Sequence, residues 1–177
     1  MRSKEQIQPA PILFDQIYLE CIRLAQFSKG ASQRYGSIVS KDGVILGRGY
    51  NRAVAHPSFG KLQREIYQGY SNHAEVEAVN DALANGKDVS GTEIFVGGYF
   101  PKQNGLLFLK NEFTCLRCPP ILKSYGISVI NVPTPGGWLQ RDVDEAMTEA
   151  KAYTNGGTYK NRLLSVLGKW TIANLIY

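Results

Sequence analysis

Apolar and polar positions follow a helical period in some stretches of the chain and an extended pattern in others. Between Ile12 and Phe27 the apolar residues recur every three or four positions, which predicts a helix that ends before Gly30. Its apolar side consists of Phe14, Ile17, Cys21, Leu24 and Ala25. Two apolar runs follow, at about residues 36–40 and 44–51, and the Lys41-Asp42-Gly43 turn between them predicts a β-hairpin.

The rest of the chain continues this mixture of helices and strands. A second helix is predicted from about Asn72 to Asn85, with Gly86 as its C-terminal cap. The later elements are a strand at 93–99, an insertion or short hairpin at 101–113, a helix leading into Gly126, a strand at 127–132 and a helix at 141–153. This order predicts a layered α/β domain and excludes an all-α or an all-β fold.

The length of 177 residues suits a single domain spanning 1–177, with a polar segment at 1–11 and an amphipathic C-terminal extension at 155–177. No stretch approaches the roughly 20 apolar residues of a membrane-spanning helix, and residues 1–11 lack the apolar run of a secretory signal. We therefore expect a cytoplasmic protein with no membrane-embedded part.

The net charge of +5 is dispersed, which favours a small anionic partner such as a nucleotide and leaves nucleic acid as a weaker alternative.

Two short stretches carry the candidate chemistry. Asn72-His73-Ala74-Glu75 opens the second helix, and Thr114-Cys115-Leu116-Arg117-Cys118 lies at or just before the third. One imidazole and two thiolates form a nitrogen and sulfur donor set that selects zinc over magnesium or calcium. Three protein ligands leave the fourth tetrahedral position open, as in catalytic zinc sites.

Each stretch also has a plainer interpretation. Asn72 and Glu75 fit a helix capping box, so Glu75 could serve only to bind a backbone N–H group. A lone C-x-x-C can be a redox pair, although redox pairs usually open the first helix of a βαβ unit. Together, however, the two stretches follow the order of the H-x-E and P-C-x-x-C signature of zinc nucleobase deaminases, with Thr114 at the position of the proline.

On these residues, the chain resembles the cytidine and deoxycytidylate deaminase superfamily over roughly residues 14–132. The segment Gly47-Arg48-Gly49-Tyr50-Asn51 is similar to the family's second strand, and Gly126-Ile127 resembles the end of the metal helix in the deoxycytidylate branch. The resemblance implies a three-layer α/β/α sandwich with a mixed central sheet of about five strands. It also implies a homo-oligomer.

The resemblance further implies that His73, Cys115 and Cys118 bind Zn²⁺, that Glu75 shuttles protons and that Asn51 binds substrate. Ala74 and His56 complete the candidate substrate contacts. His56 lies in the loop after Asn51 with Lys61 and Arg64, and this loop could contact a substrate phosphate or simply be solvated. Three departures from the family are Thr114 in place of proline, Pro119 and Pro120 after the second cysteine, and a longer insertion within residues 97–113. We therefore expect a tight turn at 115–118 with regular helix starting near Pro119.

The expected activity is hydrolytic deamination of a nucleobase amino group, with cytosine in a nucleoside or nucleotide as the substrate. The alternatives within enzymes are a deaminase of guanine or adenosine type and a deaminase of RNA or single-stranded DNA. Outside enzymes, the chain could be a zinc-stabilised binding module, which would not require Glu75. A redox protein would leave His73 and Glu75 without a shared purpose.

Overall fold

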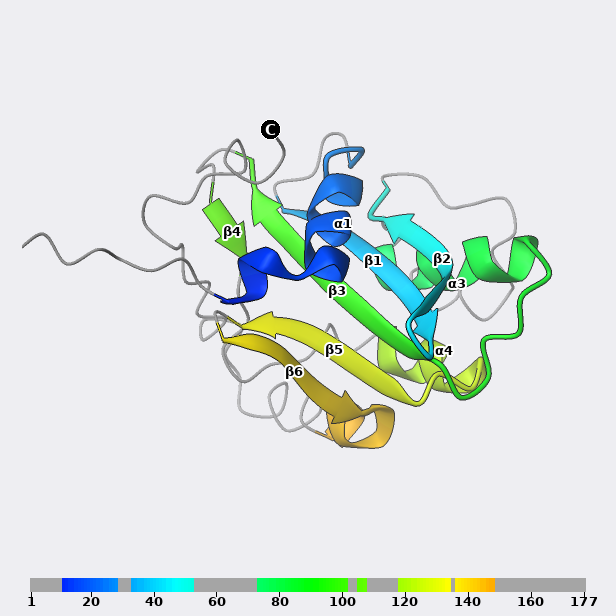
Figure 1. Cartoon of the computed structure of the whole chain (residues 1–177). Helices are drawn as coiled ribbons and strands as arrows, with labels where there is room; N and C mark the ends of the chain where they lie inside the picture. The colour runs from blue at the N-terminus through cyan, green and yellow to red at the C-terminus, as the bar shows by residue number, and fades with distance from the viewer. Residues whose placement is uncertain are drawn as a thin grey trace, which may run out of the picture.

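The computed structural model describes residues 11–28, 33–52, 73–101, 105–107, 118–134 and 136–148. Figure 1 shows the elements in these ranges. They are η1 (Pro11–Phe14), α1 (Gln16–Ala25), β1 (Arg34–Lys41), β2 (Val44–Tyr50), α3 (Ala74–Ala84), β3 (Glu93–Phe100), β4 (Gly105–Leu107), α4 (Cys118–Ser124), β5 (Val129–Thr134) and β6 (Gly137–Asp142). Residues 143–148 are also helical. Within these ranges, no helix combines the length and apolar character needed to cross a membrane.

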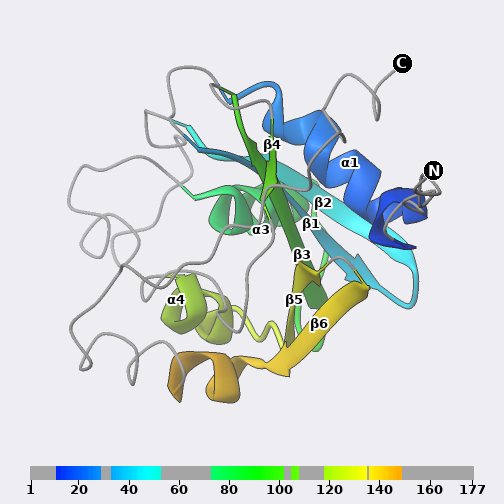
Figure 2. The same ribbon diagram turned by 90° about the vertical axis from the view of Figure 1, so that its left-hand side faces the viewer.

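A mixed sheet forms the centre of the molecule. Its strands lie in the order β2-β1-β3-β5-β6, and the short β4 pairs with β3. The β3–β5 pair is parallel, whereas the other pairs are antiparallel. Figure 2 shows α1 on one face of this sheet and α3 and α4 on the other. The three-layer α/β sandwich with a mixed central sheet is therefore confirmed.

Each face of the sheet buries its own apolar core. Ile38 and Phe95 project from β1 and β3 toward Cys21 and Leu24 of α1. The opposite core contains Val39, Val76, Ala78, Val79, Ala82, Val89, Ile94, Cys118, Ile121, Leu122, Ile127, Ile130, Val132, Val143 and Ala146. Neighbouring residues Ile38 and Val39 enter different cores because side chains alternate along a strand. The larger core holds α3 and α4 on the same face.

The predicted local signals are confirmed where they lie in the described residues. Asp42 and Gly43 both have positive φ, 50° and 79°, as the tight β1–β2 turn requires. Gly86 has φ 69° and follows α3, where Lys87 N donates to Ala82 O at 3.0 Å. The second cysteine opens α4, and Pro119 and Pro120 lie in its first turn, where proline is tolerated.

Two details of the predicted elements were wrong. Phe14 is exposed rather than part of the α1 stripe, because Asp15 caps α1 through Tyr18 N at 2.8 Å and leaves Phe14 in the separate η1 turn. The last described helical residues begin at 143, because residues 137–142 form β6 against β5. Trp138 of β6 packs against Phe95, with ring centroids 4.9 Å apart.

The contact between β2 and α3 is unusually close. A Cβ atom placed on Gly47 would lie 2.2 Å from Ala78 O, and one placed on Gly49 would lie 2.3 Å from Ala78 N. Only glycine therefore allows the helix backbone to approach the strand at this separation. Asp81 of α3 also accepts a hydrogen bond from Arg48 N at 2.9 Å. This bond satisfies an N–H group of an edge strand, which would otherwise be open to another chain.

Candidate metal centre

The starts of two helices bring three ligand-type side chains together. His73 is the N-cap of α3, with an extended backbone (φ −84°, ψ 149°), and Glu75 lies in the first turn. Cys118 is the first residue of α4. The shared core of α3 and α4 sets the distance between the helix starts. His73 and Cys118, which are 45 positions apart in the sequence, consequently face each other.

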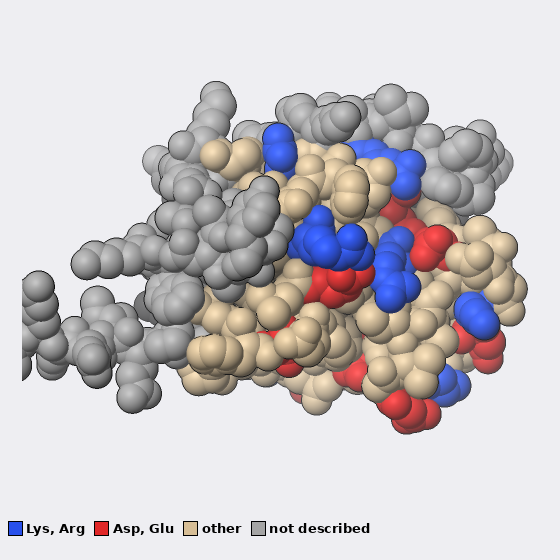
Figure 3. Space-filling model, turned by 45° about the horizontal axis from the view of Figure 1, so that its top comes forward, with Lys and Arg blue, Asp and Glu red and all other residues tan. Residues whose placement is uncertain are grey.

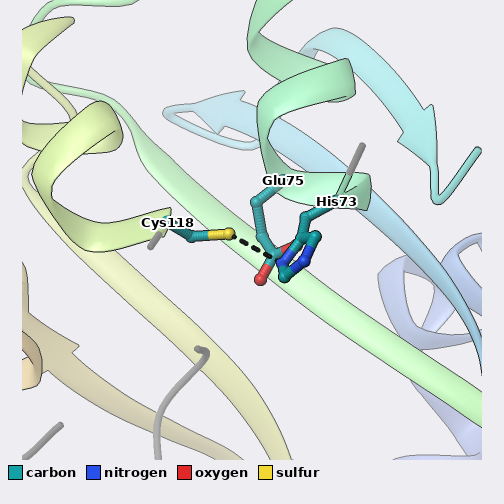
Figure 4. A group of neighbouring side chains, drawn as sticks. All are labelled: His73, Glu75 and Cys118. Atoms are coloured by element: carbon teal, nitrogen blue, oxygen red, sulfur yellow. Dashed lines mark hydrogen bonds between the residues drawn. The ribbon is translucent and has the colours of Figure 1, made fainter. Parts of the chain in front are cut away.

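Figure 4 shows the Cys118 thiol pointing from α4 toward the imidazole and carboxylate that α3 presents. Cys118 Sγ lies 3.2 Å from His73 Nδ1. One ligand atom from each of His73, Glu75 and Cys118 can be chosen so that all lie within 4.8 Å of one another. Cys118 is fully buried and Glu75 is 5% exposed, whereas His73 is partly exposed. Cys118 and Glu75 thus form the buried side of the group, and His73 lies on the side that solvent reaches.

The donor chemistry of this group suits zinc. Zinc binds imidazole nitrogen and thiolate sulfur, and its usual bond lengths place a nitrogen and a sulfur ligand about 3.6 Å apart in a tetrahedron. The 3.2 Å between His73 Nδ1 and Cys118 Sγ is close to this value. The sequence-predicted third ligand, Cys115, lies outside the described residues. Its place in the site therefore stays a prediction.

The position of Glu75 argues against the capping-box interpretation. That interpretation needs Asn72 as the N-cap and Glu75 at the third helical position. In the structure the N-cap is His73, so Glu75 is the second helical residue. Its carboxylate instead belongs to the group with His73 and Cys118. The structure therefore places Glu75 beside an imidazole and a thiol, and its role in proton transfer stays a prediction.

Asn51 ties the end of β2 to the start of β1. Its Oδ1 accepts from Tyr35 N at 2.8 Å, and its Nδ2 donates to Gln33 O at 3.0 Å. An amide side chain has two N–H groups and two oxygen lone pairs, so these bonds use half of its capacity. Ala74 is buried behind the helix start. His56 lies outside the described residues, so its contact with substrate stays a prediction.

Sequence reasoning missed an ion pair close to this group. Arg52 Nε lies 3.1 Å from Glu77 Oε2, and the Glu77 side chain is only 2% exposed. The one available signal was an acidic residue, Glu77, on a helix whose neighbouring residues are apolar. A buried carboxylate requires a partner, but the sequence does not say which cation supplies it.

The charge distribution agrees with the dispersed pattern of the sequence. On the face shown in Figure 3, basic and acidic side chains are interspersed among the described residues. Opposite charges also pair among the described residues: Glu20 of α1 binds Arg23 at 2.6 Å and Arg48 of β2 at 3.0 Å. This face of the described residues therefore carries no continuous basic groove of the kind that tracks a nucleic-acid backbone.

No family model and no curated protein match the chain. Among solved structures, it is similar to cytidine deaminase from Burkholderia pseudomallei, with 18% identity, a TM-score of 0.47 and coverage of 72% of this chain and 93% of the other. It is also similar to dCMP deaminase from the cyanophage S-TIM5 in complex with dCMP and dUMP, with 19% identity, a TM-score of 0.41 and coverage of 63% and 74%.

A third similar structure is the diaminohydroxyphosphoribosylaminopyrimidine deaminase/5-amino-6-(5-phosphoribosylamino)uracil reductase from Thermotoga maritima. It has 20% identity and a TM-score of 0.39, and the match covers 78% of this chain but 34% of the other. All three proteins are deaminases by name. Because their identities and TM-scores are low, the function of this chain has to be argued from its own residues.

Proposed function

We propose that this protein is a zinc-dependent hydrolase that removes the amino group of a nucleobase, with cytosine in a nucleoside or nucleotide as its substrate. The observation that carries the proposal is the meeting of His73, Glu75 and Cys118 at the starts of α3 and α4. An imidazole and a thiol provide metal ligands, and an adjacent carboxylate provides a proton carrier. A structural zinc site would need the first two but not the third.

In this proposal, His73, Cys115 and Cys118 hold the metal and Glu75 remains free to move protons. Zinc, when bound, supplies hydroxide at neutral pH because it lowers the pKa of water from about 15.7 toward 7. Glu75 takes the proton of the attacking water and gives it to N3 of the cytosine ring. A C–O bond then forms at C4, Glu75 carries the proton of the new C4 hydroxyl group to the amino group, and the C4–N bond breaks as ammonia leaves. The products are uracil in its nucleoside or nucleotide form and ammonia.

The surroundings of Glu75 suit this proton-carrying role. Its carboxylate is almost fully buried, so bulk water does not compete for the proton. Glu75 lies in the first turn of α3, two residues after the N-cap His73, so its carboxylate and the imidazole are presented by the same helix start. A positioned carboxylate that transfers protons contributes about 10²–10⁴-fold to a rate.

A small cytosine substrate is favoured over a polynucleotide by the charge distribution, because basic and acidic groups are interspersed on the face shown in Figure 3. Asn51 keeps unused hydrogen-bonding capacity at the end of β2, which suits contact with a polar group of the substrate. The decisive experiment is an ammonia-release screen of the zinc-loaded protein with cytidine, deoxycytidine monophosphate, adenosine, guanine and short oligonucleotides. Turnover of the cytosine compounds alone is expected. Turnover of guanine, adenosine or oligonucleotides instead would show that cytosine in a nucleoside or nucleotide is not the substrate.

Glu75→Gln tests the role of the carboxylate directly. The variant should keep one zinc per chain and lose at least about 10²-fold in turnover, because Gln cannot carry a proton. Zinc content by atomic absorption and ammonia release by a coupled assay measure the two effects. Glu20→Gln makes the same chemical change on α1, on the opposite face of the sheet, and should keep both properties.

Cys118→Ser tests the metal ligand in the same assays. Its zinc content should fall, because a catalytic site with three protein ligands depends on each of them. Loss of zinc from Glu75→Gln would mean that Glu75 is a ligand. Full zinc content with no ammonia release from any compound, in the wild-type protein, would favour a zinc-stabilised binding module.

A further inference from the structure

The Arg52–Glu77 ion pair joins the residue after Asn51 to the helix that presents His73 and Glu75. We propose that Arg52 is a positioning residue, which fixes Asn51 relative to the start of α3 and thereby sets the affinity for substrate. The inference rests on the proposed function, in which Asn51 contacts the substrate. It assigns to Arg52 a role that neither the zinc chemistry nor the substrate contacts include.

Breaking this ion pair should cost more than breaking an ordinary surface pair, because one partner is buried. Arg52 Nε lies 3.1 Å from Glu77 Oε2, and the exposed fractions of the two side chains are 42% and 2%. Solvent screens exposed pairs and leaves them with little net stabilisation. A carboxylate removed from water, in contrast, is strongly destabilised when a charged partner is lost. The buried Glu77 carboxylate therefore holds the guanidinium in place.

A second contact fixes the orientation of the guanidinium. The central carbon of the Arg52 guanidinium lies 4.6 Å from the centroid of the Tyr50 ring. A cation at this distance over an aromatic face is attracted by the ring quadrupole. Tyr50 is in turn in contact with Phe27, with ring centroids 5.8 Å apart. Arg52 is consequently held from two directions, by Tyr50 of β2 and by Glu77 of α3.

Arg52 extends an attachment that already runs along β2. Asp81 of α3 binds Arg48 N, and the glycines at 47 and 49 let strand and helix touch. Glu77 lies one helical turn before Asp81, so two acids on one side of α3 bind β2 and the residue that follows its end. Beyond Tyr50 the strand ends, and within the described residues the contact of Arg52 with Glu77 is the last one that joins this chain end to α3.

Asn51 lies between these attachments. Its side chain binds the backbone of Tyr35 and Gln33 at the start of β1, while the next residue is bound to α3. The two sets of contacts therefore fix the position of Asn51 relative to both β1 and α3, the helix that presents His73 and Glu75. Loss of the Arg52 contact would leave the β1 side intact and free the α3 side. Binding of substrate would then have to restore the lost order, at a cost in affinity.

Arg52→Met removes the charge and keeps much of the side-chain length. We expect KM for cytidine or deoxycytidine monophosphate, whichever the wild type hydrolyses, to rise about tenfold or more, with kcat and zinc content nearly unchanged, since the loss affects binding and not the proton transfer. Arg52→Lys keeps the charge but not the planar group that stacks on Tyr50. It should therefore restore part of the affinity.

The matched control is Arg48→Met. Arg48 lies on β2, four residues before Arg52, has a similar exposure of 47% and also forms an ion pair, but its partner is Glu20 of α1. The same chemical change at this position should leave KM unaltered. An equal rise of KM in Arg48→Met and Arg52→Met would overturn the proposal, because the loss of any positive charge in or next to β2 would then weaken substrate binding.

The partner is tested by Glu77→Gln and by the double variant. Glu77→Gln should also raise KM, and Arg52→Met/Glu77→Gln should raise it no further than Arg52→Met alone, because both changes break one interaction. If the rises of KM in the two single variants multiply in the double variant, the two residues do not act through one interaction. A fall in kcat with unchanged KM in Arg52→Met would also contradict it, since that result would place Arg52 in the chemical step.

Hydrogen exchange provides a measurement that does not need catalysis. Tyr35 N donates to Asn51 Oδ1, so its exchange rate reports the order of Asn51. The rate should rise several-fold in Arg52→Met and stay at the wild-type value in Arg48→Met, with no change in the amides of β5. Unchanged exchange at Tyr35, or an equal rise throughout the sheet, refutes the positioning role. If the wild type hydrolyses no tested compound, the proposed function fails while this measurement still decides whether Arg52 orders Asn51.

Discussion

Replacing Gly49 with alanine should disturb the candidate metal centre from the opposite side of α3. The new Cβ would lie 2.3 Å from Ala78 N and 2.4 Å from Ala74 O, and both atoms belong to the helix backbone. Ordinary van der Waals contact begins near 3.4 Å. The strand and the helix must therefore separate by about 1 Å, because a helix backbone cannot rotate away as a flexible side chain does.

This displacement has two measurable consequences. Inserting a methyl group into packed structure costs about 1–3 kcal/mol of the free energy of unfolding, which urea denaturation monitored by circular dichroism measures. A shift of α3 also moves His73 and Glu75 relative to Cys118, which belongs to α4. A misplacement of about 1 Å can reduce a rate about 10²-fold, so kcat/KM should fall by more than the loss of stability alone explains.

Two further alanine variants separate these effects. Gly36→Ala brings its Cβ to 1.9 Å from Cys21 O and so displaces α1, on the other face of the sheet. It should lower stability while the folded protein keeps the zinc content and turnover that the proposed function requires. Gly136 has no atom within 4 Å of the added Cβ, and Gly136→Ala should resemble the wild type in every assay. If Gly49→Ala keeps wild-type stability and kcat/KM, the idea that the β2–α3 approach sets the site geometry is wrong.

Two predictions concern α1. Hydrogen bonds from Arg23, together with its charge and that of Arg48, hold the pKa of Glu20 below its ordinary value. The ion pairs therefore stabilise the fold fully at pH values above the ordinary pKa, and this stabilisation is lost as the pH falls through the lowered pKa. Glu20→Gln should therefore lower the free energy of unfolding by about 0.5–1 kcal/mol at pH 7, and a difference that persists at pH 2 would contradict this cause. The Cys21 thiol is buried and lies 3.9 Å from Phe95 O, and this burial raises its pKa. Cys21 should therefore resist iodoacetamide at pH 8 in the folded protein and react with it after unfolding in guanidinium chloride. Equal reaction rates in the two states, followed by peptide mass spectrometry, would show that α1 does not shield it.

Local structure was predictable wherever a signal lies within a few residues of the element it controls. The Asp42-Gly43 turn requires positive φ at two positions, and Asp-Gly is a residue pair that adopts it readily. Pro119 and Pro120 predicted a helix start because proline is accepted only in the first turn. The strand β6 was missed because it is a partly exposed edge strand without a clear alternation of apolar and polar residues.

Some features of the candidate site were also predictable from the sequence, and others were not. The types and order of His73, Glu75 and Cys118 were visible in the chain, since a metal-binding chemistry depends on which donors are present. The role of Asn51 as a brace between β1 and β2 was not visible, because its partners are backbone atoms of Tyr35 and Gln33. Backbone groups have the same chemistry at every residue, so a sequence does not show which of them a side chain will meet.

The sequence by itself determined the helices, the hairpin and the identity of the candidate ligands, because backbone preference and side-chain chemistry are properties of a residue and its near neighbours. Only the tertiary structure decided that His73 Nδ1 and Cys118 Sγ lie 3.2 Å apart and that Arg52 pairs with the buried Glu77. Both outcomes depend on the packing of α3 against β2 and α4. Such packing follows from the shapes of whole surfaces brought together from distant parts of the chain, which no local pattern records.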